Sequence, residues 1–290
     1  MSENDNDKLK PAEENPWYVL ATICDKWDED DGEEFIVNGK VLTNCEVWNV
    51  RIRHYLSQGM INALLGKDNH IPLFDDTKWN EIKEDVEKRF KKRMNDYPLP
   101  GPSEIVDFSG ICFSKKVDFQ NFVFFSITEF NGSTFENEVN FENTYFYNLA
   151  NFIENTTFKA KANFKDVIFC RNAVFSNAVF YGESIFALSV FKDQVDFQNA
   201  EFLGNSNFAK CEFIMPCDFF AARFHKCYPV LLNTTFHEKI TLSAMQNTTE
   251  ITFWPDPKNC QQNPDEAKYS CEVLREQMEA QGLHEQAHFF

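Results

Sequence analysis

The chain has 290 residues, enough for one to three domains with a hydrophobic core. Lys and Arg number 28 against 45 Asp and Glu, and the net charge of −17 argues against general affinity for nucleic acid or for an anionic membrane. Phe is the anomaly, with 32 residues against only 10 Gly and 11 Pro, and this bias toward one bulky apolar residue indicates a repeat.

Sequence signals of export are weak. The first residues are polar and acidic and lack the apolar region of a signal peptide. The 9 cysteines are scattered without a C-x-x-C pair, which suits reduced thiols better than a disulfide framework. No run approaches about 18 apolar residues, so no membrane span is expected in this chain. We therefore expect a cytoplasmic protein, with any membrane association depending on sequence outside this chain.

The N-terminal part divides into a disordered segment, residues 1–15, and an α-rich region, residues 16–102. Leu42–Leu65 is expected to form one helix, with Val47, Val50, Tyr55 and Ile61 among its apolar positions. Asp75–Asn95 is expected to form a second one, with one apolar stripe consisting of Trp79, Ile82, Val86, Phe90 and Met94. The region is expected to cover the open edge of the unit that follows. A ligand-binding role for its Trp and Tyr residues is the alternative.

Residues 103–254 contain a long periodic pattern of Phe. The step between Phe residues alternates between five and six, except for three successive steps of six between Phe146 and Phe164. The ladder consists of Phe108, Phe113, Phe119, Phe124, Phe130, Phe135, Phe141, Phe146, Phe152, Phe158, Phe164, Phe169, Phe175, Phe180, Phe186, Phe191, Phe197, Phe202, Phe208, Phe213, Phe219 and Phe224. The pattern then fades through Val230, Phe236, Leu242 and Phe253.

A small or β-branched residue, such as Ala162 or Val195, stands two positions before most of these Phe residues, and the residue between them is often polar. This alternation is typical of a short strand with two inward side chains. Steps of five and six would scatter the rings around an α-helix, and a left-handed hexapeptide coil would need a constant step of six. Four faces per coil place each Phe over the Phe about 22 residues further on, at the strand spacing of about 4.8 Å. Phe122 and Phe125, which lie between ladder positions, are expected to point outward.

Stretches such as ANFKDVIF, VDFQNAEF, SNFAKCEF and CDFFAARF resemble the unit of the bacterial pentapeptide-repeat proteins, in which a small residue, Asp or Asn, and Leu or Phe precede two turn residues. The alternating spacing is similar to the Phe-rich variant of that family. The resemblance implies a mainly β fold, a right-handed quadrilateral β-helix, over residues 103–254. It implies little about function, because family members differ widely in role.

Residues 255–290 are expected to form a C-terminal helical hairpin, with a first helix at Ala267–Gln281 and a second one from His284. The sequence ends within that second helix, so we expect a fragment of a longer protein. Phe289 and Phe290 are expected to dock in a homodimer through this end, because two-fold pairing buries both edges at once.

Two side-chain clusters are candidate sites. His284, Glu285 and His288 fit the H-E-x-x-H pattern of a zinc hydrolase, but a third downstream ligand is absent. His225, Cys227 and His237 lie close in the sequence, but a Cys/His nucleophile needs a cleft that a Phe-filled coil does not offer. We therefore predict no enzymatic activity, no cofactor and no metal site.

The predicted function is a structural or interaction scaffold whose solenoid faces bind a protein partner, without direct binding of nucleic acid. The resemblance also raises the alternative of a DNA mimic that modulates DNA gyrase. A mimic needs near-continuous negative charge along the rod. Lys115, Lys116, Lys159, Lys161 and Lys165 interrupt that charge, which favours the scaffold.

Overall fold

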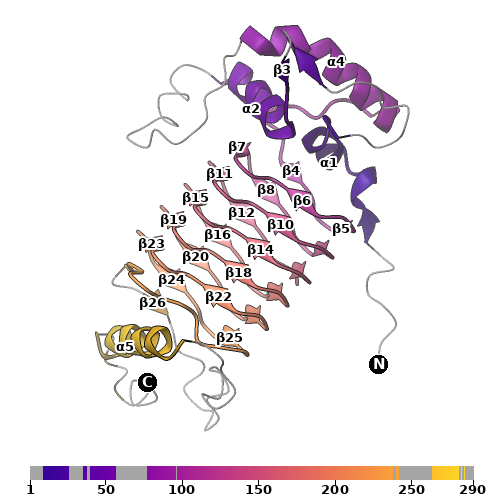
Figure 1. The fold of residues 1–290 in the computed structure, drawn as a ribbon. Coiled ribbons are helices and arrows are strands. Elements are labelled where there is room, and N and C mark those ends of the chain that lie inside the picture. Colours follow the sequence, from indigo (N-terminus) through magenta and orange to yellow (C-terminus); the bar gives the residue numbers. More distant parts are fainter. Residues whose placement is uncertain are drawn as a thin grey trace, which may run out of the picture.

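The computed structural model describes residues 9–25, 35–37, 40–56, 77–95, 97–237, 240–241, 263–280, 282 and 284. In this part of the chain a β-solenoid of about six turns lies between an N-terminal helical region and a C-terminal helix (Figure 1). The expected mainly β solenoid is thereby confirmed. None of the helices in these ranges is long and apolar enough to cross a membrane.

Each turn of the solenoid contributes one short strand to each of four parallel sheets, which we call faces 1 to 4 in chain order. Face 1 contains β4 (Val106–Asp107), β8 (Thr128–Glu129), β12 (Ala150–Asn151), β16 (Ala173–Val174), β20 (Val195–Asp196), β24 (Cys217–Asp218) and β26 (Ile240–Thr241). Face 2 contains β1 (Lys10–Pro11), β5 (Ile111–Phe113), β9 (Thr134–Phe135), β13 (Thr157–Phe158), β17 (Val179–Phe180), β21 (Glu201–Phe202) and β25 (Arg223–Phe224). Face 3 contains β6 (Val117–Asp118), β10 (Val139–Asn140), β14 (Ala162–Asn163), β18 (Ser184–Ile185) and β22 (Ser206–Asn207). Face 4 contains β7 (Val123–Phe124), β11 (Tyr145–Phe146), β15 (Ile168–Phe169), β19 (Val190–Phe191) and β23 (Glu212–Phe213).

Two kinds of corner alternate around each turn, and they explain the alternating steps of five and six. The corners after faces 1 and 3, which give the steps of five, contain a residue with positive φ, as at Asn121 (φ 63). There the N–H of Phe122 donates to the carbonyl of Phe119 over 3.1 Å. A positive φ at the third residue of such a turn is the signature of a type II turn. The corners after faces 2 and 4 contain one more residue and no positive φ.

The three successive steps of six have a local cause. The corner between Phe152 and Phe158 has positive φ at both Glu154 (φ 59) and Asn155 (φ 62), where the other corners of this kind have one such residue. Two adjacent positive φ values are the pattern of a type I′ turn, so this corner holds one extra residue. The next turn keeps its pairing, since Thr157 pairs with Thr134 and with Val179.

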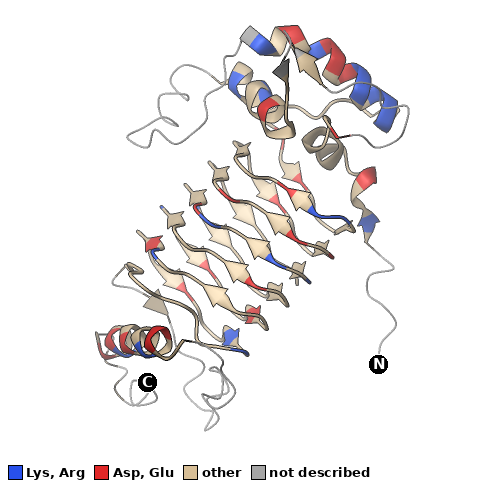
Figure 2. Cartoon of the chain, in the orientation of Figure 1, with Lys and Arg blue, Asp and Glu red and all other residues tan. Residues whose placement is uncertain are grey.

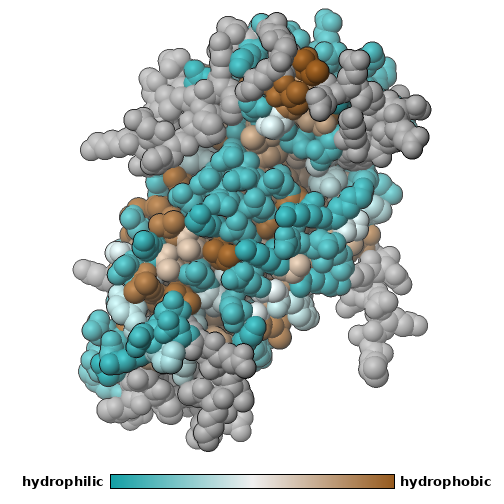
Figure 3. Space-filling model, viewed as in Figure 1, coloured by the Kyte–Doolittle hydropathy of each residue, from teal (hydrophilic) through white to brown (hydrophobic). Residues whose placement is uncertain are grey.

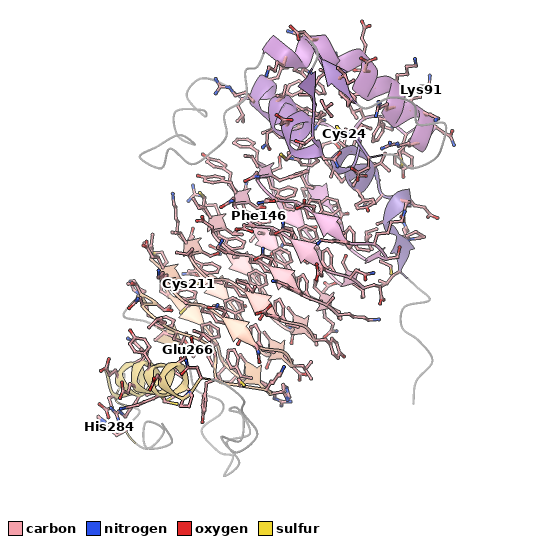
Figure 4. All side chains as sticks on the ribbon, in the orientation of Figure 1. Cys24, Lys91, Phe146, Cys211, Glu266 and His284 are labelled. Carbon is pink, nitrogen blue, oxygen red and sulfur yellow. The ribbon has the colours of Figure 1, made fainter. Side chains whose placement is uncertain are left out.

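The Phe ladder fills the space between the faces in four stacks (Figure 4). Within a stack, rings of neighbouring turns lie nearly parallel, as in Phe152–Phe175 (4.7 Å between ring centroids, 4°) and Phe175–Phe197 (5.0 Å, 9°). Rings of neighbouring stacks meet edge to face, as in Phe164–Phe175 (5.6 Å, 88°). Both arrangements are favourable for aromatic pairs. The predicted ladder is therefore confirmed.

The N-terminal helices are α1 (Pro16–Ala21), α2 (Asn44–Tyr55) and α4 (Thr77–Met94), with the short η2 (Ala12–Glu14) and the hairpin of β2 (Ile36–Val37) and β3 (Lys40–Val41). They cover the first turn of the solenoid (Figure 1). Trp48 Nε1 donates to the carbonyl of Val123 over 2.9 Å, and the ring lies 5.4 Å from that of Phe124. The Asn49 side chain accepts from Val123 N–H (2.9 Å) and donates to the Asn121 carbonyl (2.8 Å), as a paired strand would.

Because Trp17, Trp48 and Trp79 are buried, these rings belong to the core, and the capping prediction accounts for them better than ligand binding does. The predicted disorder of residues 1–15 is wrong for residues 10–15. Lys10–Pro11 pairs with Ile111–Cys112 as an added strand, and the Asn15 side chain caps α1. This pairing satisfies backbone groups that the first turn would otherwise leave exposed.

The predicted helix boundaries need correction. The helix predicted at Leu42–Leu65 starts at Asn44, where Thr43 and Glu46 form a capping box, and ends at Tyr55 because Leu56 has extended backbone. Residues 57–76 lie outside the described ranges. The helix predicted at Asp75–Asn95 is α4, and Asn95 follows it with φ 50, a left-handed residue that ends helices.

The sequence predicts that Phe122 points outward, and this prediction is wrong. Its side chain is 1% exposed, and its ring centroid lies 5.5 Å from Trp48 and 5.5 Å from Phe119. It occupies an inward position just after a corner, where later turns hold smaller residues such as Thr144 and Val167. In the first turn this position faces the helices, so a large ring fills the space between the two regions.

The C-terminal end of the solenoid is covered by α5 (Pro264–Ala280). Leu274 and Met278 are buried against the core, and the Ser270 hydroxyl accepts from the N–H of Leu231 over 3.2 Å. The first helix of the predicted hairpin is therefore present, and it packs under the last turn. Of the second helix predicted from His284, only His284 itself is described, and Phe289 and Phe290 fall outside the described residues.

Candidate functional site: the outer faces of the solenoid

The interior of the solenoid has no room for a substrate. The ladder rings are almost completely buried, and several small inward polar groups donate to carbonyls of the preceding turn. Thr144 Oγ1 donates to the Phe119 carbonyl (2.7 Å), and Cys211 Sγ donates to the Phe186 carbonyl (2.8 Å). Burial raises the pKa of the Cys211 thiol, so the reactive thiolate is suppressed. Any function of the solenoid must therefore lie on its outer faces or at its ends.

The candidate Cys/His cluster does not form a visible catalytic arrangement. His225 Nε2 lies 3.9 Å from Glu201 Oε2 on face 2, whereas Cys227 is buried at the start of the last turn. Within the described ranges, no group of three or more His, Cys, Asp and Glu residues could hold a metal ion. Of the H-E-x-x-H segment, His284 is described and exposed, and residues 285–288 lie outside the described ranges.

A cleft of about 490 Å³ lies between the N-terminal helices and face 3. Its lining includes Cys24, Asp25, Asn44 and Cys45. Asn44 Nδ2 donates to Asp25 Oδ1 (2.7 Å), and Asn44 Oδ1 accepts from Cys24 N–H (2.8 Å). Burial raises the pKa of the Cys24 thiol to about 12 and also raises that of Cys45. These paired polar groups and protonated thiols serve to join α1 to α2, and they offer no activated nucleophile.

The outward positions of faces 1 and 3 explain the Asp and Asn residues of the repeat. At these positions the side-chain oxygen accepts from the N–H two residues on, as Asp118 does from Gln120 (3.1 Å) and Asp218 from Phe220 (2.7 Å). Such Asx turns start each corner. On face 3 the amides also form a ladder between turns, since Asn163 Nδ2 donates to Asn140 Oδ1 over 2.9 Å. The polar residue of the repeat is therefore a turn-former first.

Face 1 carries an acidic column. Its outward residues from the first turn to the last are Asp107, Glu129, Asn151, Val174, Asp196, Asp218 and Thr241, with no Lys or Arg among them. We refer to Asp107, Glu129, Asp196 and Asp218 as the acidic column. A groove of about 340 Å³ crosses its C-terminal half. Burial raises the pKa of Asp196, and the hydrogen bond from the Gln198 N–H lowers this pKa in part. The neighbouring carboxylate of Asp218 raises the pKa of Asp196 further.

Elsewhere on the rod, charges of opposite sign are paired between turns. An acid and a base at the same corner of successive turns are neighbours, because one turn contains about 22 residues. The corner pairs are Lys116–Glu138 (3.0 Å), Lys159–Glu136 (2.8 Å), Lys161–Glu183 (3.5 Å), Lys165–Glu142 (2.7 Å) and Arg171–Asp193 (4.0 Å). Such exposed pairs contribute little to stability because solvent screens the charges. Red and blue segments consequently alternate along the rod (Figure 2).

Face 4 is the apolar face. Its outward column consists of Val123, Tyr145, Ile168, Val190 and Glu212, and a second column at the following corner consists of Phe125, Tyr147, Cys170, Lys192 and Ile214. Val123 and Tyr145 are buried (5% and 6% exposed), so we call the remaining apolar members, Phe125, Tyr147, Ile168, Cys170, Val190 and Ile214, the apolar stripe. The rings of Phe125 and Tyr147 stack at 4.8 Å, and Cys170 Sγ donates to Tyr145 Oη over 2.8 Å. Ile214 is 50% exposed, and the neighbouring Met215 is 39% exposed.

Figure 3 shows brown side chains gathered on the side of the rod where β15, β19 and β23 lie in Figure 1. The apolar stripe was not predicted from the sequence, because the outward residues show no pattern when they are read in chain order. The signal is nevertheless present in the sequence. It emerges when the residues on either side of every fourth ladder Phe, starting at Phe124, are read as separate columns.

One comparison with known proteins, the comparison with family models, agrees with this geometry. No curated protein and no solved structure matches the chain. The family model described as pentapeptide repeats (9 copies) matches residues 175–223. That segment includes the ladder from Phe175 to Phe219, and the same stacks continue on both sides of it. Residues 175–223 of the solenoid are therefore pentapeptide repeats, and their Phe ladder continues through the turns on both sides.

Proposed function

We propose that the chain is a non-enzymatic scaffold that presents the outer faces of its solenoid to a protein partner. The observation that carries this proposal is the difference between the faces. A filled interior and covered ends leave the four flat faces as the available surface, and face 4 carries two neighbouring columns whose outward residues are mostly apolar and partly exposed. Contiguous exposed apolar residues are typical of interaction surfaces.

The DNA-mimic alternative receives less support. A mimic needs unbroken negative charge along the rod. Asn151 and Val174 interrupt the acidic column, and the corner ion pairs offset acids elsewhere. Inhibition of gyrase supercoiling by the purified chain would reverse this ranking.

Cellular location and self-association belong to the same proposal. The eight described cysteines form no disulfide bonds, which supports work in the reducing cytoplasm. The homodimer through the C-terminal end stays a prediction, because Phe289 and Phe290 lie outside the described residues.

The proposal can be tested by photo-cross-linking from each face in turn. Successive faces of one turn carry matched half-buried aliphatic residues, namely Ile168 (face 4), Val174 (face 1), Val179 (face 2) and Ile185 (face 3). Each is replaced singly by a photo-reactive phenylalanine derivative in cells that express the chain. A scaffold gives a discrete protein adduct from one or two of these positions. Absence of adducts from all four positions, or the same diffuse adducts from each, would contradict it.

A further inference from the structure

The apolar stripe has the dimensions of one helix. Face 4 comprises five described strands, so at about 4.8 Å per strand the stripe is about 20 Å long. An α-helix covers this length with about 13 residues, at 1.5 Å per residue. The face is only one short strand wide, and strands of neighbouring turns already pair with each other, as β11 does with β7 and β15. A partner therefore meets side chains on this face and finds no free sheet edge to extend.

The charges next to the stripe determine which kind of helix fits. Face 4 joins face 1 through one corner, so the acidic column runs parallel to the stripe. At that corner Arg171 and Asp193 lie 4.0 Å apart and offset each other. The acidic column has no Lys or Arg among its outward residues, and Asp196 and Asp218 are paired neighbours in it. Burial raises the pKa of Asp196, and the neighbouring Asp218 carboxylate raises it further.

We propose that the apolar stripe of face 4 is the docking surface for one amphipathic, basic helix of a protein partner. The apolar side of that helix lies on Tyr147, Ile168 and Val190, and Lys or Arg side chains along one flank reach over the corner to the acidic column. This inference rests on the proposed scaffold function and specifies its partner. Long basic side chains can place their alkyl stems on apolar surface while the charged group meets a carboxylate.

The probe is an 18-residue peptide of Leu and Lys arranged to form an amphipathic helix, with binding to the whole chain measured by fluorescence anisotropy. Two comparison peptides separate the contributions. One has the same composition in an order that gives no apolar stripe, and the other has Glu in place of Lys. We expect the amphipathic basic peptide to bind at least about tenfold more tightly than either, which corresponds to about 1.4 kcal/mol.

Matched substitutions identify the surface. Ile168→Lys places a charge in the stripe, and Ile185→Lys makes the same change at an equally half-buried outward position on face 3. We expect Ile168→Lys to weaken binding by about tenfold or more and Ile185→Lys to leave it within about twofold. Equal thermal midpoints of the two variants establish that both are folded.

A second pair tests the acidic column. The double change Asp196→Asn and Asp218→Asn removes two charges and keeps the side-chain oxygens that accept in the turns. Asp118→Asn is the matched change on face 3, where the side chain makes the same turn contact. We expect the double change to weaken binding about fivefold at low salt and much less at about 0.5 M salt. Asp118→Asn should have no effect at either salt concentration.

Equal loss from Ile168→Lys and Ile185→Lys, or equal binding of the reordered peptide, would overturn the inference, because binding would then be general attraction to an acidic protein. Photo-adducts from another face together with no peptide binding would also overturn it, while the scaffold function would stand. Absence of adducts from all four faces would remove the scaffold function itself.

Discussion

The substitution Phe175→Ala tests how much the Phe ladder stabilises the fold. Phe175 is completely buried and stacks between Phe152 (4.7 Å) and Phe197 (5.0 Å). Its edges meet Phe164 (5.6 Å) and Phe186 (5.4 Å). Removal of a buried Phe side chain destabilises a protein by about 3–5 kcal/mol. We expect the upper part of this range, because the ring has aromatic neighbours in both adjacent turns and the strand pairing around it prevents collapse of the cavity.

The assay is equilibrium unfolding in urea, with two comparison variants. Phe125→Ala removes a half-buried outer ring with one stacked partner, Tyr147, and should reduce the free energy of unfolding by about 1 kcal/mol. Phe122→Ala should instead resemble Phe175→Ala, because Phe122 is buried beneath Trp48. If Phe175→Ala and Phe125→Ala had equally small effects, the assignment of inward and outward residues would be refuted.

Three further predictions concern the corners, the thiols and the cap. Gly182→Ala should reduce the free energy of unfolding by about 3 kcal/mol or more, because the new Cβ would overlap the backbone of Ala160 in the preceding turn. At Gly110 a new Cβ meets open space, so Gly110→Ala should cost only about 1 kcal/mol through its positive φ. Equal urea midpoints of the two variants would contradict this prediction. Because burial raises the pKa of Cys211, above about pH 9 the thiol of the unfolded chain loses its proton while that of the folded chain keeps it. The free energy of unfolding should therefore fall with rising pH in the native chain, with a slope that exceeds that of Cys211→Ala by about 1.4 kcal/mol per pH unit. Asn49→Ala removes two hydrogen bonds to the backbone of the first turn and should reduce stability by about 1–3 kcal/mol in thermal melts, and an unchanged midpoint would show that the helices do not cover that edge.

The solenoid could be predicted from sequence because its rule is local and repeated. Each strand is two or three residues long, and each corner follows at a fixed distance, so one spacing determines every stack. The extra corner residue at Asn155 is visible as an irregular step, but the positive φ of both Glu154 and Asn155 is not visible in the spacing.

The ends of the solenoid were harder to predict because they depend on contacts between distant segments. Phe122 stands two positions before Phe124, at an inward position that later turns fill with smaller residues such as Thr144 and Val167. Trp48, 74 residues earlier in the sequence, packs against the larger ring and fills the space at this end. Likewise Lys10 and Pro11 have the composition of a disordered tail, and they are ordered because Ile111 and Cys112 offer an unpaired strand edge. The apolar stripe was missed for a different reason, since its members are separated by a whole turn and appear as a column only once the register is known.

The stacks, the ion pairs between turns and both outer columns all depend on that register, and one substitution tests it directly. Thr134 and the native Cys112 are paired outward residues of adjacent turns on face 2. Paired Cα atoms of neighbouring strands lie about 5 Å apart, within the range of about 4.4–6.8 Å that a disulfide spans. Mild oxidation of Thr134→Cys should therefore give an intramolecular disulfide with Cys112, identified by peptide mass mapping, whereas Thr157→Cys, two turns from Cys112, should not form one. No Cys112–Cys bond in Thr134→Cys, or an equally efficient one in Thr157→Cys, would contradict the register on which the four faces depend.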